Sequence, residues 1–172
     1  MIAALPLPAT LPTKTEGVLL RRAVVEDLST LMSLLSDDPI SASRVDRAVD
    51  TDEPALRAAL IEVIDDPAND LLVVIAASGE AVGTMQLTRI PGMARRGSAR
   101  LLIEAVRVRS TQRSNGIGSA MMRWVTDSAA PAVGASLVQL TSDKARTDAH
   151  RFYERLGFVG SHLGFKLAVP VS

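Results

Sequence analysis

Cysteine is absent from this sequence of 172 residues. Its absence excludes disulfides, catalytic thiolates and metal sites ligated by cysteine. It also fits a reducing compartment, so we expect a cytoplasmic protein. Histidine occurs only as His150 and His162, which are too few and too far apart to indicate a metal site. We therefore expect no metal.

The sequence also has few aromatic residues, no net charge and no long apolar run. Aromatic residues make up 3% of the chain and hydrophobic residues 47%, so the core must be mainly aliphatic. Lys plus Arg and Asp plus Glu both number 19, which gives no attraction to nucleic acid or to an acidic membrane. No run approaches the ~18 apolar residues of a membrane span. We expect no nucleic-acid partner and no membrane partner.

The amino terminus is apolar but is interrupted by Pro6, Pro8 and Pro12 and lacks a basic start, which argues against a secretory signal peptide. We expect residues 1–16 to form an extended arm. The length of residues 17–172 suits one core, so we predict a single domain there. A homodimer in which the arm packs on a neighbour stays open.

The hydrophobic periodicity predicts a mixed α/β (α+β) fold with the order β-α-α-β-β-β-α-β-α-β. We expect a mostly antiparallel central sheet of six to seven strands, flanked by about four helices. Strands are predicted over residues 18–24, 71–77, 81–90, 99–109, 136–140 and 163–169, and helices over residues 26–36, 54–66 and 117–130. A last helix is predicted from an N-cap at Asp143 to Gly157 at its C′ position.

Residues 113–119 read Arg-Ser-Asn-Gly-Ile-Gly-Ser, between a β-branched run and an amphipathic one. The first turn of a helix leaves backbone N–H groups without intrahelical partners, and the helix dipole adds positive charge there. Gly116 and Gly118 remove the Cβ atoms that would keep a phosphate away, and Arg113 can add a charge-assisted contact. Asn115 tolerates unusual turn dihedrals. The stretch predicts a phosphate site, with a purely steric turn as the alternative.

The spacing of this loop excludes two common phosphate motifs. No lysine follows Gly118, as a Walker loop requires, and Met121 stands where a Rossmann fingerprint has its third glycine. The stretch resembles Arg/Gln-x-x-Gly-x-Gly/Ala, the pyrophosphate signature of the GNAT superfamily of acetyl-CoA-dependent N-acetyltransferases. The resemblance runs from about residue 71 to residue 165. It rests on residues 103–108, 113–118 and 149–158 occurring in this order.

The resemblance implies a GNAT-like acyl-CoA N-acyltransferase fold and acetyl-CoA as co-substrate, with transfer to a primary amine of a small-molecule or peptide acceptor. In that family the strand before the loop splays from its neighbour after a bulge, and its backbone binds the pantetheine arm. Many members carry an asparagine seven residues before the tyrosine of the last helix, where this sequence has Arg146. The cofactor-binding residues so implied are Val106, Arg107, Val108, Arg113, Ser114, Asn115, Gly116, Ile117, Gly118, Ser119 and Arg146.

Two residues are candidates for catalysis. The resemblance implies that Tyr153 points toward the CoA sulfur, where its hydroxyl would protonate the leaving thiolate; otherwise Tyr153 is a core aromatic. Glu104 is either a general base or a strand carboxylate paired with Arg107 or Arg109. Strand parity puts Glu104 on the opposite face from both arginines.

Three functions stay open: an acetyltransferase, a non-catalytic acyl-CoA-binding or sensor domain, and a phosphate-binding domain for another nucleotide. We expect the acceptor contacts in the loops over residues 37–53 and 91–97. The first loop is acidic and the second basic, so charge alone does not identify the acceptor.

Overall fold

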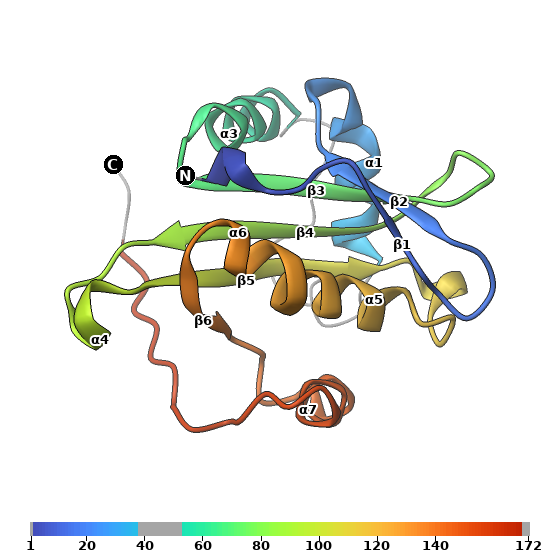
Figure 1. Ribbon diagram of the computed structural model, residues 1–172. Helices are drawn as coiled ribbons and strands as arrows, with labels where there is room; N and C mark the ends of the chain where they lie inside the picture. Colours follow the sequence, from blue (N-terminus) through green and yellow to red (C-terminus); the bar gives the residue numbers. More distant parts are fainter. Residues whose placement is uncertain (1, 38–52, 170–172) are drawn as a thin grey trace. The chain divides into compact units, whose positions relative to one another are not determined.

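The computed structural model of the chain describes residues 2–37 and 53–169. Its main element is a six-stranded sheet with the order β1-β2-β3-β4-β5-β6 (Figure 1). The strands are β1 (Ala9–Leu11), β2 (Val18–Arg22), β3 (Asn69–Ile75), β4 (Ala81–Ile90), β5 (Ala99–Val108) and β6 (Ala135–Leu140). The four successive pairs from β1·β2 to β4·β5 are antiparallel. The predicted mixed fold with a mostly antiparallel sheet is confirmed.

The main helices are α1 (Leu28–Ser36), α3 (Glu53–Asp65), α5 (Ile117–Trp124) and α7 (Thr147–Arg155), with the short helices α4 (Ala94–Gly97) and α6 (Ala130–Ala132). Within the described residues, 3-10 turns lie at Ile2–Ala4, Val25–Asp27 and Ser110–Gln112, and a π-helical turn lies at Val125–Ala129. The chain divides into two compact units, Met1–Gln139 and Leu140–Ser172. None of the helices within residues 2–37 and 53–169 has both the length and the apolar character needed to cross a bilayer.

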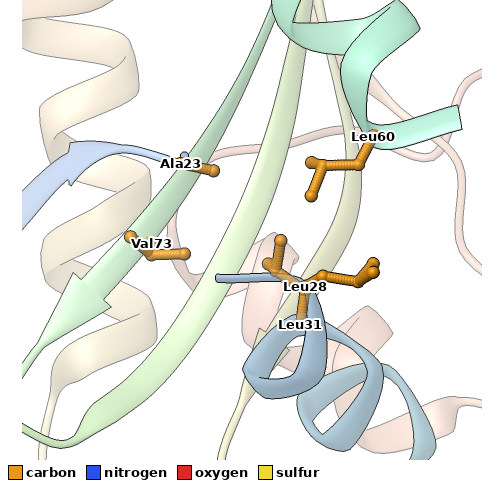
Figure 2. Close-up of a cluster of buried hydrophobic side chains, with 5 residues drawn as sticks. All are labelled: Ala23, Leu28, Leu31, Leu60 and Val73. Carbon is orange, nitrogen blue, oxygen red and sulfur yellow. The ribbon is translucent and has the colours of Figure 1, made fainter. Parts of the chain in front are cut away.

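In the first unit, helices cover both faces of the sheet. α1 and α3 lie over one face, and α5 lies over the other (Figure 1). Figure 2 shows the cluster under α1 and α3, where Leu28 and Leu31 of α1, Leu60 of α3 and Val73 of β3 meet Ala23. All five side chains are buried, as aliphatic groups at helical and strand spacing should be.

The second face is packed by α5, as its periodicity predicts. Ile117, Ala120, Met121 and Trp124 are buried, and so is Val125 just beyond the helix end. The other two helices of this unit differ from the expected pattern in detail. Helical spacing predicts that Leu35 of α1 and Ile64 of α3 face inward, but both are exposed, and α1 buries Leu34 together with Leu28 and Leu31. Helical periodicity predicted where the helices lie, but the element packed against each helix determines which of its apolar residues are buried.

A bulge in β5 changes the faces of its residues. Gln86 of β4 pairs with Glu104, and Thr84 pairs with Arg107, so two steps along β4 correspond to three steps along β5. Ala105, inside this irregular stretch, has φ 49°, a left-handed value that β-strand residues do not normally adopt. Glu104 and Arg107 therefore lie on the same face, and the prediction from simple alternation that they lie on opposite faces is wrong. The predicted bulge itself is present.

The face that carries Glu104 and Arg107 is the one under α1 and α3. Val73 lies in the cluster of Figure 2 and pairs with Thr84. Directly paired residues of antiparallel strands share a face. Thr84 and its partner Arg107 therefore point toward the α1 and α3 side.

The second unit contains α7, and its described residues after the helix, up to residue 169, form no strand. Gly157 follows α7 with φ 89°, which confirms the predicted left-handed C′ residue. The N-cap position is Arg146, so the prediction of Asp143 as N-cap is wrong; Asp143 instead accepts the N–H of Ala145 in the turn before the helix (2.9 Å). The predicted strand over residues 163–169 is also wrong. This segment has no regular structure and leaves Phe165 93% exposed. An apolar, β-prone sequence becomes a strand only where a sheet edge accepts its hydrogen bonds.

Candidate cofactor site and active site

The predicted phosphate loop lies between β5 and α5. Ser114 and Gly116 both have left-handed backbones, with φ 69° and 88°, and Gly116 is the N-cap of α5. The first hydrogen bond of the helix runs from the N–H of Ala120 to the carbonyl of Gly116 (2.9 Å). The three N–H groups before Ala120 therefore have no partner within the helix. Two left-handed residues that lead into a free helix N-terminus form a backbone suited to an anion.

The non-glycine residue with positive φ in this loop is Ser114 rather than Asn115, the residue that the sequence favoured for it. The side chain of Asn115 instead donates to Oε1 of Gln112 (3.0 Å), which holds the loop from within. An Asn side chain that stabilises a turn through hydrogen bonds is an alternative use of the same residue type.

Arg113 is exposed and is held by backbone carbonyls. Its Nε donates to the carbonyl of Val108 (3.4 Å) and its terminal nitrogen to the carbonyl of Asp37 (3.1 Å). The Asp37 carboxylate accepts the N–H of Ser110 (2.5 Å) and its hydroxyl (2.9 Å). The hydrogen bond from the Ser110 N–H holds the pKa of Asp37 below its usual value, helped by the charge of Arg113. The end of α1 thus fixes the start of the loop.

Lys14, in the connection between β1 and β2, also contacts the loop. Its backbone N–H donates to the carbonyl of Asn115 (3.0 Å), and its ammonium donates to the carbonyl of Ser114 (3.1 Å). The β1–β2 turn lies beside the segment between β5 and α5 (Figure 1). Sequence reasoning missed Lys14 because the two partners are 100 residues apart and no local motif marks the contact.

The segment expected to hold the pantetheine arm remains paired with β4 to its end. Gly83 pairs with Val108, and the N–H of Arg109 donates to the carbonyl of Val82 (2.8 Å). A Cβ on Gly83 would stand 3.0 Å from the carbonyl oxygen of Arg107, so glycine allows the two backbones to come this close. The carbonyl of Val106 accepts a hydrogen bond from the Arg107 guanidinium (2.8 Å).

Glu104 is exposed on the face under α1 and α3, opposite Gln86 on β4. Of its two predicted partners, Arg109 is used elsewhere: its Nε lies 3.0 Å from Oε1 of Glu80, and it donates to the carbonyl of Ala81 (3.1 Å). The amide of Gln86 donates to Oδ1 of Asn69 (3.0 Å). Glu104 therefore continues a polar row that crosses three strands.

Tyr153 and Arg146 belong to the second unit and are described within it. The Tyr153 ring is half-buried between two aromatic rings: its centroid lies 5.1 Å from that of Phe152 and 5.7 Å from that of Phe158, both edge-to-face. Arg146 precedes α7, and its carbonyl accepts the N–H of His150 (3.0 Å). The His150 ring is hydrogen-bonded to the carbonyl of Asp143 (2.8 Å).

The acceptor loops are only partly described. Residues 38–52 of the first predicted loop lie outside the described residues. In the second loop Arg95 and Arg96 are exposed and have left-handed backbones. In the described ranges no three His, Cys, Asp or Glu side chains are grouped in a way that could hold a metal ion.

Comparison with known proteins gives a family match and similar structures. The model of the Acetyltransferase (GNAT) family matches residues 30–158. A solved transcriptional regulator from Bacillus halodurans is 38% identical, with a TM-score of 0.82 over 88% of this chain and 99% of that one. A putative acetyltransferase from Agrobacterium tumefaciens is 26% identical, with a TM-score of 0.73 over 87% of this chain and 99% of that one.

One curated relative has a named activity. The aminoalkylphosphonate N-acetyltransferase of Salmonella typhimurium is 39% identical over 67 residues, which are 39% of this chain. The match spans 43% of that relative's length.

Proposed function

Because the chain belongs to the Acetyltransferase (GNAT) family, we propose that it transfers the acetyl group of acetyl-CoA to the primary amine of a small molecule. The observation that carries this proposal is the loop before α5. Two left-handed residues, a free helix N-terminus and Arg113 meet there directly after a bulged strand. The partial similarity to an aminoalkylphosphonate N-acetyltransferase supports a small amine as acceptor.

In this proposal the loop binds the pyrophosphate of CoA. The N–H groups from Ser114 to Ser119 supply neutral donors, and the dipole of α5 supplies a partial positive charge. Gly118, in the first turn of α5, leaves room for the phosphate oxygens. Arg113 adds a full charge once its guanidinium turns from the Asp37 carbonyl to the ligand.

The pantetheine arm would lie along β5. β4 takes up one edge of β5 as far as Val108, so the backbone groups of residues 106–108 that point away from β4 would bind the arm, as an added strand would. The thioester carbonyl would accept the N–H of Val108, which polarises it for attack. Arg146 would reach a pantetheine carbonyl or a phosphate.

The reaction requires two proton transfers. The amine nitrogen attacks the acetyl carbon, the bond from that carbon to sulfur breaks, and the amine loses a proton to a base. Glu104 is the proposed base, since it is exposed on the side of the sheet under α1. The hydroxyl of Tyr153 is the proposed donor to the departing thiolate. Both substrates react directly in a ternary complex, so no side chain is acylated.

Substitution of Gly118 tests the proposal. Acetyl-CoA at 100 times its Kd should stabilise the wild-type protein by about 2.7 kcal/mol, seen as a rise in melting temperature. Gly118→Val should lose most of this rise, because a branched side chain would occupy the approach of the pyrophosphate. Gly160→Val is the control, since a Cβ there meets no atom within 4 Å.

Activity is then measured as thiol release in a panel of amines that includes aminoalkylphosphonates. We expect release with at least one amine and its loss in Gly118→Val. Acetyl-CoA binding without release in any amine would instead identify a non-catalytic acyl-CoA-binding domain. A larger melting shift with ATP or NAD than with CoA would overturn the choice of cofactor.

A further inference from the structure

We propose that Lys14, from the turn between β1 and β2, is a phosphate ligand of the acetyl-CoA site. The inference rests on the proposed function and adds to it a cation that precedes the family-matched residues 30–158. It starts from two hydrogen bonds that Lys14 makes with consecutive carbonyls of the phosphate loop, those of Ser114 and Asn115.

These contacts fix Lys14 at the loop at two points. The backbone bond to Asn115 (3.0 Å) holds the turn, and the bond from Nζ to Ser114 (3.1 Å) holds the end of the side chain. A Cβ on Gly116 would stand 3.2 Å from Cγ of Lys14 and 3.4 Å from its backbone nitrogen. The stem of Lys14 therefore lies against the backbone of Gly116, the N-cap of α5.

The ammonium of Lys14 retains donors for a ligand. A lysine ammonium has three N–H bonds, and the carbonyl of Ser114 accepts one of them. Among the described residues, no carboxylate forms an ion pair with Lys14. A cation that a hydrogen bond already positions loses little side-chain freedom when it binds a phosphate.

The electrostatics of the loop support the same assignment. The ammonium of Lys14 donates to the loop carbonyl of Ser114, and Arg113, at the start of the loop, donates to the carbonyls of Val108 and Asp37. The nearby carboxylate of Asp37 is occupied by the N–H and hydroxyl of Ser110. An anion at the N-terminus of α5 would be attracted by both cations as well as by the helix dipole. The multiply charged phosphates of CoA fit this arrangement.

The experiment compares binding of acetyl-CoA, acetyl-dephospho-CoA and acetyl-pantetheine to the wild-type protein, Lys14→Met and Lys14→Arg by calorimetry. Lys14→Met keeps an unbranched stem and the backbone bond to Asn115, and it removes the charge together with the hydrogen bond to the Ser114 carbonyl. We expect it to weaken acetyl-CoA binding by about 10- to 100-fold, the range for a hydrogen bond to a charged group. Binding of acetyl-pantetheine, which has no phosphate, should stay unchanged, and Lys14→Arg should restore much of the affinity.

Lys166→Met, in the exposed carboxyl-terminal segment, removes the same charge elsewhere and should bind like the wild-type protein. If Lys14→Met loses as much affinity for acetyl-dephospho-CoA as for acetyl-CoA, Lys14 binds the pyrophosphate. If it loses less affinity for acetyl-dephospho-CoA, Lys14 binds the 3′-phosphate. Both results support the proposal. Wild-type affinity of Lys14→Met for acetyl-CoA, or an equal loss with acetyl-pantetheine, would overturn it. Failure of the wild-type protein to bind acetyl-CoA would refute the proposed function instead, so the two failures are distinct.

Discussion

Substitution of Ala105 tests the bulge that sets the faces of β5. At an ordinary strand position valine is favoured over glycine by about 1 kcal/mol, because a branched side chain packs well on a pleated surface. At Ala105 the order should reverse. With φ 49°, a Cβ stands too close to backbone carbonyl oxygen, which costs roughly 1–2 kcal/mol for a residue other than glycine.

The expected sizes follow from that strain. Ala105→Gly relieves it but gives the unfolded chain more freedom, which offsets about 0.4–1 kcal/mol, so the net change should lie between about zero and 1.5 kcal/mol of stabilisation. Ala105→Val places a β-branched residue at positive φ and should destabilise by about 1–3 kcal/mol. The half-buried position of Ala105 adds only a small burial term to either change.

Urea denaturation measures both free energies of unfolding. Arg100 is the matched control, because it is exposed on the same strand and is paired regularly with Ile90. There Arg100→Val should be more stable than Arg100→Gly. The reasoning is refuted if Ala105→Val is more stable than Ala105→Gly, since that order would show an ordinary strand backbone at residue 105.

Three further predictions concern catalysis and pH. Tyr153→Phe keeps the ring between Phe152 and Phe158, so acetyl-CoA affinity by calorimetry should change little while kcat falls roughly 10²–10⁴-fold; a wild-type kcat would exclude Tyr153 as the acid. The hydrogen bonds from Arg21 hold the pKa of Asp27 below its usual value, so Asp27 stabilises the fold above the unfolded-state pKa, and this stability is lost as the pH falls through the lowered value. Asp27→Asn should therefore cost about 1–2 kcal/mol in urea denaturation at neutral pH and progressively less below about pH 4, whereas a constant cost would contradict the linkage. Burial raises the pKa of Asp70, so ionisation of this carboxyl group destabilises the fold. In urea denaturation the cost of Asp70→Asn should therefore grow, rather than shrink, as the pH falls.

The parts of the fold that the sequence predicts best depend on local signals. β4 runs over Ala81–Ile90, the predicted range, because apolar residues on both sides of Ser78-Gly79-Glu80 mark a hairpin and Gly79 accepts the positive φ of its turn. The turn before α5 is predictable for a similar reason, since the glycine spacing and the start of an amphipathic helix are both visible in adjacent residues.

The features that the sequence did not predict depend on distant partners. A bulge is a property of two strands, so the alternation along β5 cannot reveal that Ala105 is the extra residue. The contact of Asp37 with Ser110 joins the end of α1 to a turn that lies 73 residues later. The segment over residues 163–169 shows the opposite error, since its local pattern is that of a strand but it pairs with no sheet edge within the described chain.

The pairing of β2 with β3 has a practical consequence for where the protein can be cut. The family match begins at residue 30, and a fragment trimmed to that boundary would lack both β1 and β2. The edge of β3 would then be open over Leu72, Val73 and Val74, three side chains that are fully buried in the intact chain. An unpaired, apolar and β-branched edge is a template for strand addition by other copies. Such a fragment should aggregate on expression, whereas a boundary placed ahead of Ala9 keeps the edge closed.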